Sequence, residues 1–231
     1  MDAKDFRIDP HGFMQQNVVI VNLNSGDVKN FSYEPSTKSV VRPGSDFLIE
    51  ATVRPLPNAT VTGCTGEAFS LRKADASVPD DEKRKIYFVP YAQNSLCGTI
   101  LSRKAQWVFT ATMDGCSFGV GSQPGDGTAM VVHANAGTSG GSGGGREQQV
   151  KMQARLLEST FGTQGHALDS VVDPSSYMVD AGGTPTTGAD RIRSTTFGHR
   201  VHGIWVFYTL RYRVSGSGLA PQYVHEGVHA Q

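Results

Sequence analysis

The 231-residue chain has few cysteines, no excess charge of either sign and no long apolar run. Its three cysteines, Cys64, Cys97 and Cys116, show no CxxC spacing, so these thiols alone can build neither a disulfide framework nor a tetrahedral zinc site. A single Cys64–Cys97 disulfide stays open. Basic and acidic residues number 21 each, so net charge favours neither nucleic acid nor anionic membranes as partners.

Targeting and membrane signals are also lacking. No stretch reaches the roughly 18 apolar residues that a membrane span requires. The first residues, Met1–Arg7, lack the apolar core of a secretory signal peptide. We therefore expect a soluble protein in the reducing cytoplasm of the cell that produces it, without membrane association.

What the chain does contain is glycine: 27 glycines and 11 prolines accompany a hydrophobic content of 38%. This composition favours short strands and many turns over a helical bundle. The length fits a single domain over residues 1–231, with 1–16 as a loosely held lead-in and 215–231 as a polar tail. We predict an α/β fold, a β-sandwich of mostly antiparallel strands with one or two flanking helices.

Hydrophobic patterns place the main strands. The clearest covers Ile204–Val214, where both faces begin apolar, so this strand should be central and covered on both sides. Asn17–Leu23 and Phe47–Val53 read as further strands, and Pro174–Asp180 as a short one.

The strongest helix prediction covers Glu147–Ser159. It rests on an apolar stripe made of Val150, Met152, Ala154, Leu156 and Leu157. The glycine-rich stretch before it, Gly137–Arg146, is predicted as a flexible loop at the mouth of a site, acting as a lid.

The most informative stretch is Thr110–His133. Gln123-Pro124-Gly125-Asp126 favours a type II turn, because proline presets the second position and glycine tolerates the third. A regular hairpin closed by this turn pairs positions whose numbers sum to 249. Cys116 and His133 would then be directly opposed, with Cβ atoms about 4.5–5.5 Å apart.

A thiol beside an imidazole predicts an activated sulfur nucleophile, because histidine lowers the thiol pKa and shuttles a proton. Gly115 leaves the backbone free to approach a substrate, so the N–H groups of Gly115 and Cys116 are candidate oxyanion donors. The competing interpretation is that Cys116 is ordinary buried packing and His133 ordinary polar surface.

The order Thr110-x5-Cys116, followed by a short hairpin ending in His133, resembles the cysteine–histidine protein-glutamine deamidases. That group includes the cytotoxic necrotizing factor catalytic domains, the Burkholderia lethal factor and the chemotaxis deamidase CheD. The resemblance implies that Cys116 and His133 form the catalytic dyad and that Thr110 supports the histidine. The toxin members tend to carry Leu-Ser-Gly-Cys, where this chain has Asp114 before the glycine. We expect that carboxylate to disfavour the thiolate.

The resemblance also implies a reaction. A protein glutamine would be hydrolysed to glutamate through a Cys116 thioester, without a cofactor or metal. By resemblance, the substrate would be a host protein, either a Rho-family GTPase or a translation-initiation RNA helicase, and the single-domain size slightly favours the helicase. The resemblance further implies a bacterial toxin or effector that acts as a monomer. If the chain is a toxin, other machinery or another chain would deliver it to the host cytosol.

Two alternatives remain. His225-Glu226-Gly227-Val228-His229 matches the HExxH pattern of zinc proteases, in which two histidines one helical turn apart bind the metal and the glutamate activates water. That motif needs a helix, and Gly227 disfavours one. The second alternative is a non-enzymatic, β-rich binding module in which cysteine and histidine are structural.

Overall fold

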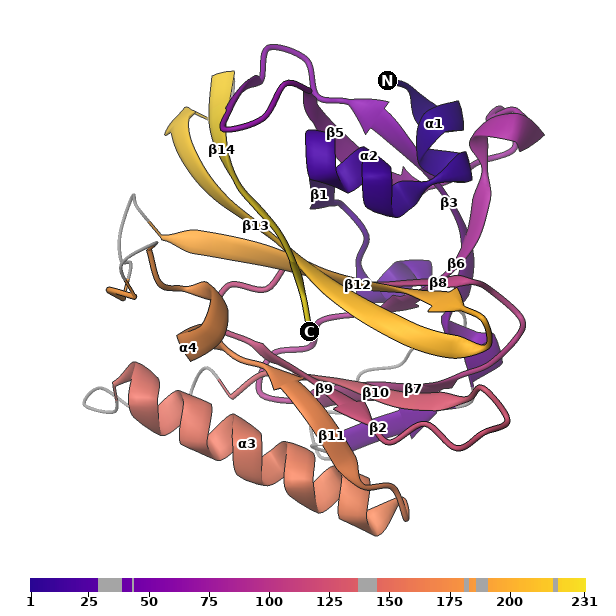
Figure 1. Cartoon of the computed structure of the whole chain (residues 1–231), viewed down its shortest axis with the longest axis vertical. Helices are drawn as coiled ribbons and strands as arrows, with labels where there is room; N and C mark the ends of the chain where they lie inside the picture. The colour runs from indigo at the N-terminus through magenta and orange to yellow at the C-terminus, as the bar shows by residue number, and fades with distance from the viewer. Residues whose placement is uncertain (29–38, 43, 137–144, 181–182, 186–190, 218–219) are drawn as a thin grey trace.

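The computed structural model describes residues 1–28, 39–42, 44–136, 145–180, 183–185, 191–217 and 220–231, and its strands form two sheets (Figure 1). Among these residues the larger sheet has nine strands, in the order β1 (Val18–Val21), β5 (Ala68–Lys73), β3 (Leu48–Pro55), β6 (Arg84–Val89), β8 (Trp107–Thr110), β12 (Ile192–Val201), β13 (Ile204–Ser217), β14 (Ala220–Ala230) and β4 (Thr60–Thr62). The smaller sheet has five, in the order β11 (Leu168–Val172), β9 (Ser117–Gly121), β10 (Ala129–Ala134), β7 (Leu96–Leu101) and β2 (Ser39–Arg42).

Four α-helices flank these sheets within the described residues: α1 (Ala3–Ile8), α2 (Pro10–Gln16), α3 (Arg146–Thr163) and α4 (Pro174–Tyr177). Short 3-10 turns lie at η1 (Ser25–Asp27), η2 (Gly44–Phe47) and η3 (Asp80–Glu82). Most neighbouring strands run antiparallel, whereas β1–β5, β6–β8, β14–β4 and β2–β7 are parallel. The predicted α/β sandwich is confirmed.

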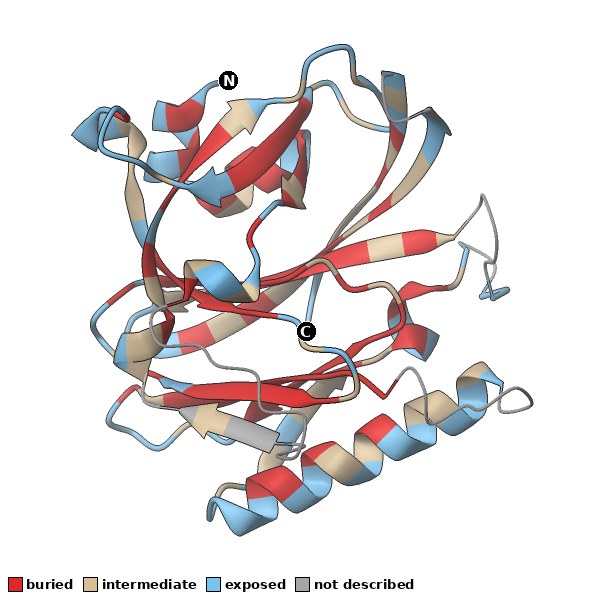
Figure 2. Cartoon of the chain, turned by 180° about the vertical axis from the view of Figure 1, so that it is seen from behind, coloured by how far each residue is buried: buried red, intermediate tan, exposed pale blue. Residues whose placement is uncertain are grey.

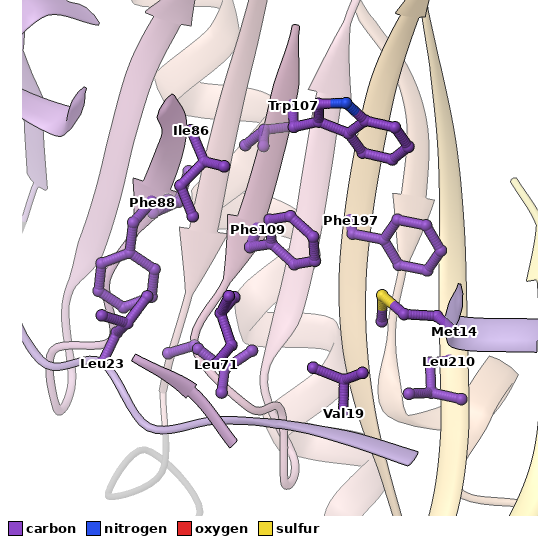
Figure 3. Close-up of a cluster of buried hydrophobic side chains, with 14 of the residues drawn as sticks. Met14, Val19, Leu23, Leu71, Ile86, Phe88, Trp107, Phe109, Phe197 and Leu210 are labelled. Carbon is purple, nitrogen blue, oxygen red and sulfur yellow. The ribbon is translucent and has the colours of Figure 1, made fainter. Parts of the chain in front are cut away.

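The large sheet buries apolar side chains on both faces. Figure 3 shows one face, where side chains from β1, β5, β6, β8, β12 and β13 gather with Met14 of α2. The opposite face meets the small sheet, as the ring contact between Phe118 of β9 and Phe207 of β13 shows, with 6.0 Å between centroids. Strand β13 lies between β12 and β14, as expected for a central strand.

The prediction of a loosely held segment over residues 1–16 is wrong. Asp2 caps α1 by accepting from the backbone N–H groups of Lys4 and Asp5. Phe6, Phe13 and Met14 are fully buried. The polar appearance of this segment comes from its outer face, while the apolar residues recur at intervals that place them on the inner side of two short helices.

The polar-tail prediction for residues 215–231 is also wrong, because most of this segment is strand β14. His225 Nε2 lies 3.0 Å from the Met14 carbonyl, which brings β14 back against α2. The large sheet therefore curls around the N-terminal helices, and its last long strand is part of the core structure (Figure 1).

Helix α3 confirms the predicted helix and extends it to Thr163, but its buried stripe differs from the prediction. Leu157 and Phe161 pack on the small sheet, whereas Met152 is exposed. Figure 2 shows both buried and exposed positions along this helix. Gln153 is fully buried in place of an apolar residue. Gly119 of β9 permits the close packing of Phe161 on the small sheet, since a Cβ at position 119 would lie 2.9 Å from the Phe161 ring.

Other predictions have mixed outcomes. Pro174–Asp180 begins as α4, not as a strand, because Asp173 caps the turn and Pro174 occupies its first position. The predicted lid falls largely on residues 137–144, which lie outside the described residues. No helix among the described residues is long and apolar enough to cross a membrane.

Candidate functional site

The Cys116 and His133 side chains lie on the face of the small sheet that meets the large sheet. Along β10, Val131 belongs to the core between the sheets, whereas Val132 and Ala134 pack toward α3. Because side chains alternate along a strand, His133 shares the inner face with Val131. Cys116 belongs to the same inter-sheet core, one residue before β9. The structure therefore places both predicted site residues on one face.

Their predicted direct opposition is wrong. In the β9–β10 hairpin His133 pairs with Phe118 and Ala134 pairs with Ser117, so paired numbers sum to 251. The turn lies one residue later than predicted, since the Gly127 N–H donates to the Pro124 carbonyl at 3.1 Å. A turn placed one residue later changes the sum of paired residue numbers by two, so each side chain stays on the same face of the sheet. Cys116 and His133 are thus diagonal neighbours, a relation typically spanning about 7–8 Å.

In the observed register, Asn135 occupies the position opposite Cys116. Its side-chain Nδ2 donates a hydrogen bond to Cys116 Sγ at 3.3 Å. Asn135 and His133 are two residues apart in one extended segment, so they flank the sulfur on the same face. The predicted register pairs Asn135 with Asp114, so the sequence does not indicate Asn135 as the neighbour of the sulfur.

His133 is buried in the core between the sheets. Burial lowers the pKa of His133 to about 4, and the nearby Val89 backbone carbonyl opposes this shift. Neither ring nitrogen makes a hydrogen bond among the described residues. The Tyr91 ring meets the imidazole edge-on at 6.1 Å between centroids, and Tyr91 is 42% exposed. Tyr91 therefore links the buried histidine to the molecular surface.

The expectation of a lowered thiol pKa is contradicted. Burial raises the pKa of Cys116 to about 11, while the Asn135 amide and the Asp114 backbone N–H act in the opposite direction. Cys116 is only 3% exposed. At neutral pH the free protein therefore holds a neutral thiol beside a neutral imidazole.

Helices α3 and α4 fix the backbone just before the sulfur. Gly115 has φ of +98°, which a side chain would strain, and its carbonyl accepts from Gln149 Nε2 and Gln153 Nε2, each at 2.9 Å. Its N–H donates to the Tyr177 hydroxyl at 2.8 Å, and that hydroxyl donates to the Cys116 carbonyl at 3.0 Å. The Gly115 N–H is thus engaged, which corrects its predicted role as an oxyanion donor.

Asp114 is neutralised by two arginines. Its carboxylate lies 2.5 Å from Arg191 Nε and 3.6 Å from Arg193 Nε. The negative charge of Asp114 raises the Cys116 pKa, as expected from sequence, but Arg191 lowers it and burial has the largest effect. Strand β12 and the residue before it therefore partly offset the charge of Asp114.

Thr110 ends β8, where it pairs in parallel register with Val89. Its hydroxyl is buried and has no hydrogen-bond partner within the described part of the chain. The Val89 carbonyl accepts the Ala111 N–H at 3.0 Å and also lies near His133. Thr110 and Val89 therefore lie side by side at the ends of β8 and β6, and Val89 is the residue beside His133. No hydrogen bond joins Thr110 to His133 among the described residues.

The HExxH alternative is contradicted by the backbone. His225, Glu226 and His229 lie on strand β14, where four residues span about 13 Å instead of one helical turn. Glu226 forms an ion pair with Arg213. No group of three potential metal ligands occurs within the ranges that the structure describes. Cys64, Cys97 and Cys116 are free thiols, so the Cys64–Cys97 disulfide is absent.

Comparisons with known proteins add little to this geometry. No family model and no curated protein matches the chain. Among solved structures, the C-terminal domain of CNFy from Yersinia pseudotuberculosis is similar over 80% of this chain and 87% of that domain, with 10% identity and a TM-score of 0.29. A TM-score of this size does not establish a common fold.

Proposed function

We propose that the chain is a cysteine-dependent amidohydrolase that converts glutamine side chains of a protein substrate to glutamate. The observation that carries this proposal is the placement of Cys116 and His133 as diagonal neighbours on one sheet face, with the Asn135 amide on the sulfur. The resemblance of the Thr110–His133 stretch to the glutamine deamidases supplies the reaction class.

The pKa values decide how the dyad would work. Moving the proton from a thiol with pKa about 11 to an imidazole with pKa about 4 costs on the order of 10 kcal/mol, before the ions attract each other. A resting thiolate–imidazolium pair is therefore disfavoured. His133 would instead accept the thiol proton as the sulfur attacks the carboxamide carbon.

The remaining steps conserve protons. The sulfur–carbon bond forms as His133 takes the thiol proton, and His133 then returns that proton to the departing ammonia. Water attacks the resulting thioester, His133 accepts its proton, and cleavage of the carbon–sulfur bond releases glutamate and restores the thiol. Because the Gly115 N–H is engaged by Tyr177, we propose the Cys116 N–H and the Asn135 amide as stabilisers of developing negative charge.

The substrate proposal follows the resemblance. A host Rho-family GTPase or a translation-initiation RNA helicase is the proposed target, reached in the host cytosol by the protein acting as a monomer. We propose no cofactor, since each step uses only Cys116, His133, Asn135 and water. Thr110 is proposed to support the end of β8 beside Val89, and through it the histidine.

Mass spectrometry of a host-cell extract tests the activity. Wild-type protein should convert specific glutamines to glutamate, with a gain of about 0.98 Da per site. Cys116→Ser and His133→Gln should abolish this conversion, whereas Cys64→Ser, which changes another free thiol, should retain it. Conversion that persists in Cys116→Ser would contradict Cys116 as the nucleophile, and no conversion in the wild type would favour the non-enzymatic binding module.

A further inference from the structure

A basic pocket lies away from the dyad and is used by no step above. Its volume is about 450 Å³, which falls within the range of small-molecule sites. Six cationic residues and no carboxylate line it: Arg7, Lys83, Arg84, Lys85, Arg103 and Lys104. These are six of the 21 basic residues in a chain of zero net charge, so composition alone does not account for the concentration.

The fold brings these side chains together from three segments. Arg7 lies near the end of α1, Lys85 near the start of β6, and Lys104 in the connection from β7 to β8. Strands β6 and β8 are parallel neighbours, so the segments that precede them lie side by side at the same end of the two strands. The pocket is thus a consequence of the topology.

Most of these cations form no close ion pair with a carboxylate. Lys83 pairs with Asp80 at 3.1 Å, and the other five form no ion pair among the described residues. Two acidic residues of η3 form ion pairs with cations outside the pocket: Asp81 pairs with Lys4, and Glu82 pairs with Arg54. Asp9 acts electrostatically on Arg84 and Asp81 on Arg7 without forming ion pairs with them, but the cations outnumber these carboxylates, so an entering anion would relieve their mutual repulsion.

Arg84 is partly buried. Its guanidinium lies 5.0 Å from the centre of the Trp107 ring. Burial and the nearby charge of Arg7 lower the pKa of Arg84 to about 10, so it stays protonated at neutral pH. A half-buried guanidinium beside other cations is a suitable group for binding phosphate, which it can contact with two parallel hydrogen bonds.

We propose that this pocket binds a multiply phosphorylated small anion, either free or as the headgroup of a lipid. Several phosphate groups match several clustered cations. The aromatic ring beside the pocket is not available for stacking a nucleobase: Trp107 is 5% exposed, and Arg84 and His199 already contact it. The ligand is therefore expected to be recognised through its phosphates.

The pocket is independent of the proposed deamidase site. Strand β6 begins with Arg84 at the pocket and ends with Val89 beside His133, a length of about 16 Å. A ligand in the pocket would leave the dyad free.

Isothermal titration calorimetry on the full chain tests the proposal with two soluble probes, inorganic pyrophosphate and inositol trisphosphate. Saturable binding at one site is expected. The double variant Arg103→Gln/Lys104→Gln changes exposed residues of a loop and should weaken binding about tenfold or more, since it removes two charge-assisted contacts. Vesicles of phosphatidylcholine with and without phosphatidylinositol bisphosphate show whether the headgroup is also bound on a membrane.

The matched control is Arg72→Gln/Lys73→Gln, which neutralises an exposed Arg-Lys pair at the end of β5 with the same change in net charge. It should change affinity less than twofold. Equal weakening by both double variants, no saturable binding of either soluble probe, or tighter binding of an RNA oligonucleotide than of inositol trisphosphate would overturn the proposal.

Discussion

Cys116 and His133 are both shifted toward their neutral forms, and burial is the main cause in each case. The sequence correctly indicates the pair of residue types and their common face. It cannot indicate their pKa values, because these depend on how deeply the second sheet covers the hairpin. The opposing effects of Asp114 and Arg191 on the thiol likewise depend on residues 77 positions apart.

Acid should destabilise the protein through His133. Its folded pKa is about 4, below the usual 6.5, so its contribution is fully present above pH 6.5 and is lost as pH falls toward 4. The size is about 3 kcal/mol. Urea unfolding at several pH values should show this loss in the wild type and a shallower acid dependence in His133→Gln. Equal acid dependence in both proteins would mean that His133 titrates normally.

At the scale of single elements, α3 differs most from its expected role. The sequence predicts a helix with an apolar stripe, whereas the structure uses Gln149 and Gln153 on the inner side to hold the Gly115 carbonyl. Glutamine carries no apolar periodicity, so a hydrophobic pattern cannot reveal this contact. The helix is therefore a support for the nucleophile's backbone as well as a cover for the small sheet.

Gln153→Leu tests this support. Gln153 accepts from the Ser117 hydroxyl at 2.5 Å and donates to Gly115, so the change leaves buried polar groups without a partner. We expect a loss of about 1–3 kcal/mol in unfolding free energy and a fall in kcat of up to about 100-fold. Chemical denaturation and kinetics on an identified substrate measure both. Gln148→Leu, on the exposed side of the same helix, should be nearly neutral; if it matches Gln153→Leu, the contact is unimportant.

The N-terminal helices provide a second test among elements. Phe6 is fully buried, and its ring lies 5.6 Å from that of Phe13 and 5.9 Å from that of Phe109. Phe6→Ala should therefore cost about 3–5 kcal/mol. Ile8, in the same helix, is 74% exposed, so Ile8→Ala should change stability by less than about 0.5 kcal/mol. Equal unfolding midpoints for the two variants would restore the interpretation of residues 1–16 as a loose segment.

The β9–β10 hairpin shows what the turn residues alone cannot determine. Pro124 and Gly125 correctly indicate a turn, but two neighbouring placements satisfy the same residues. The observed one begins at Pro124 and ends at Gly127, which has φ of +76°. That choice makes Asn135 the neighbour of the sulfur and His133 its diagonal partner. One turn position therefore decides which side chain contacts Cys116.

For the whole molecule, strand patterns predict the sandwich but not the sheet that each strand joins. Strands β8 and β9 follow each other in sequence, yet they belong to different sheets. This crossing brings Val89 and Thr110 from the large sheet toward His133 on the small one. The pairing of β6 with β8 joins residues about 20 positions apart, which no local pattern specifies.

In the proposed function, Cys116 and His133 act together on a glutamine side chain. The most direct measurement is covalent labelling by a chloroketone analogue of glutamine, located by peptide mass spectrometry, with the partly exposed free thiol Cys64 as internal control. We predict labelling of Cys116 in the wild type, its loss in His133→Gln, and little labelling of Cys64 in either protein. Labelling of Cys116 that is unchanged in His133→Gln, or labelling of Cys64 alone, would show that Cys116 and His133 do not form a catalytic dyad.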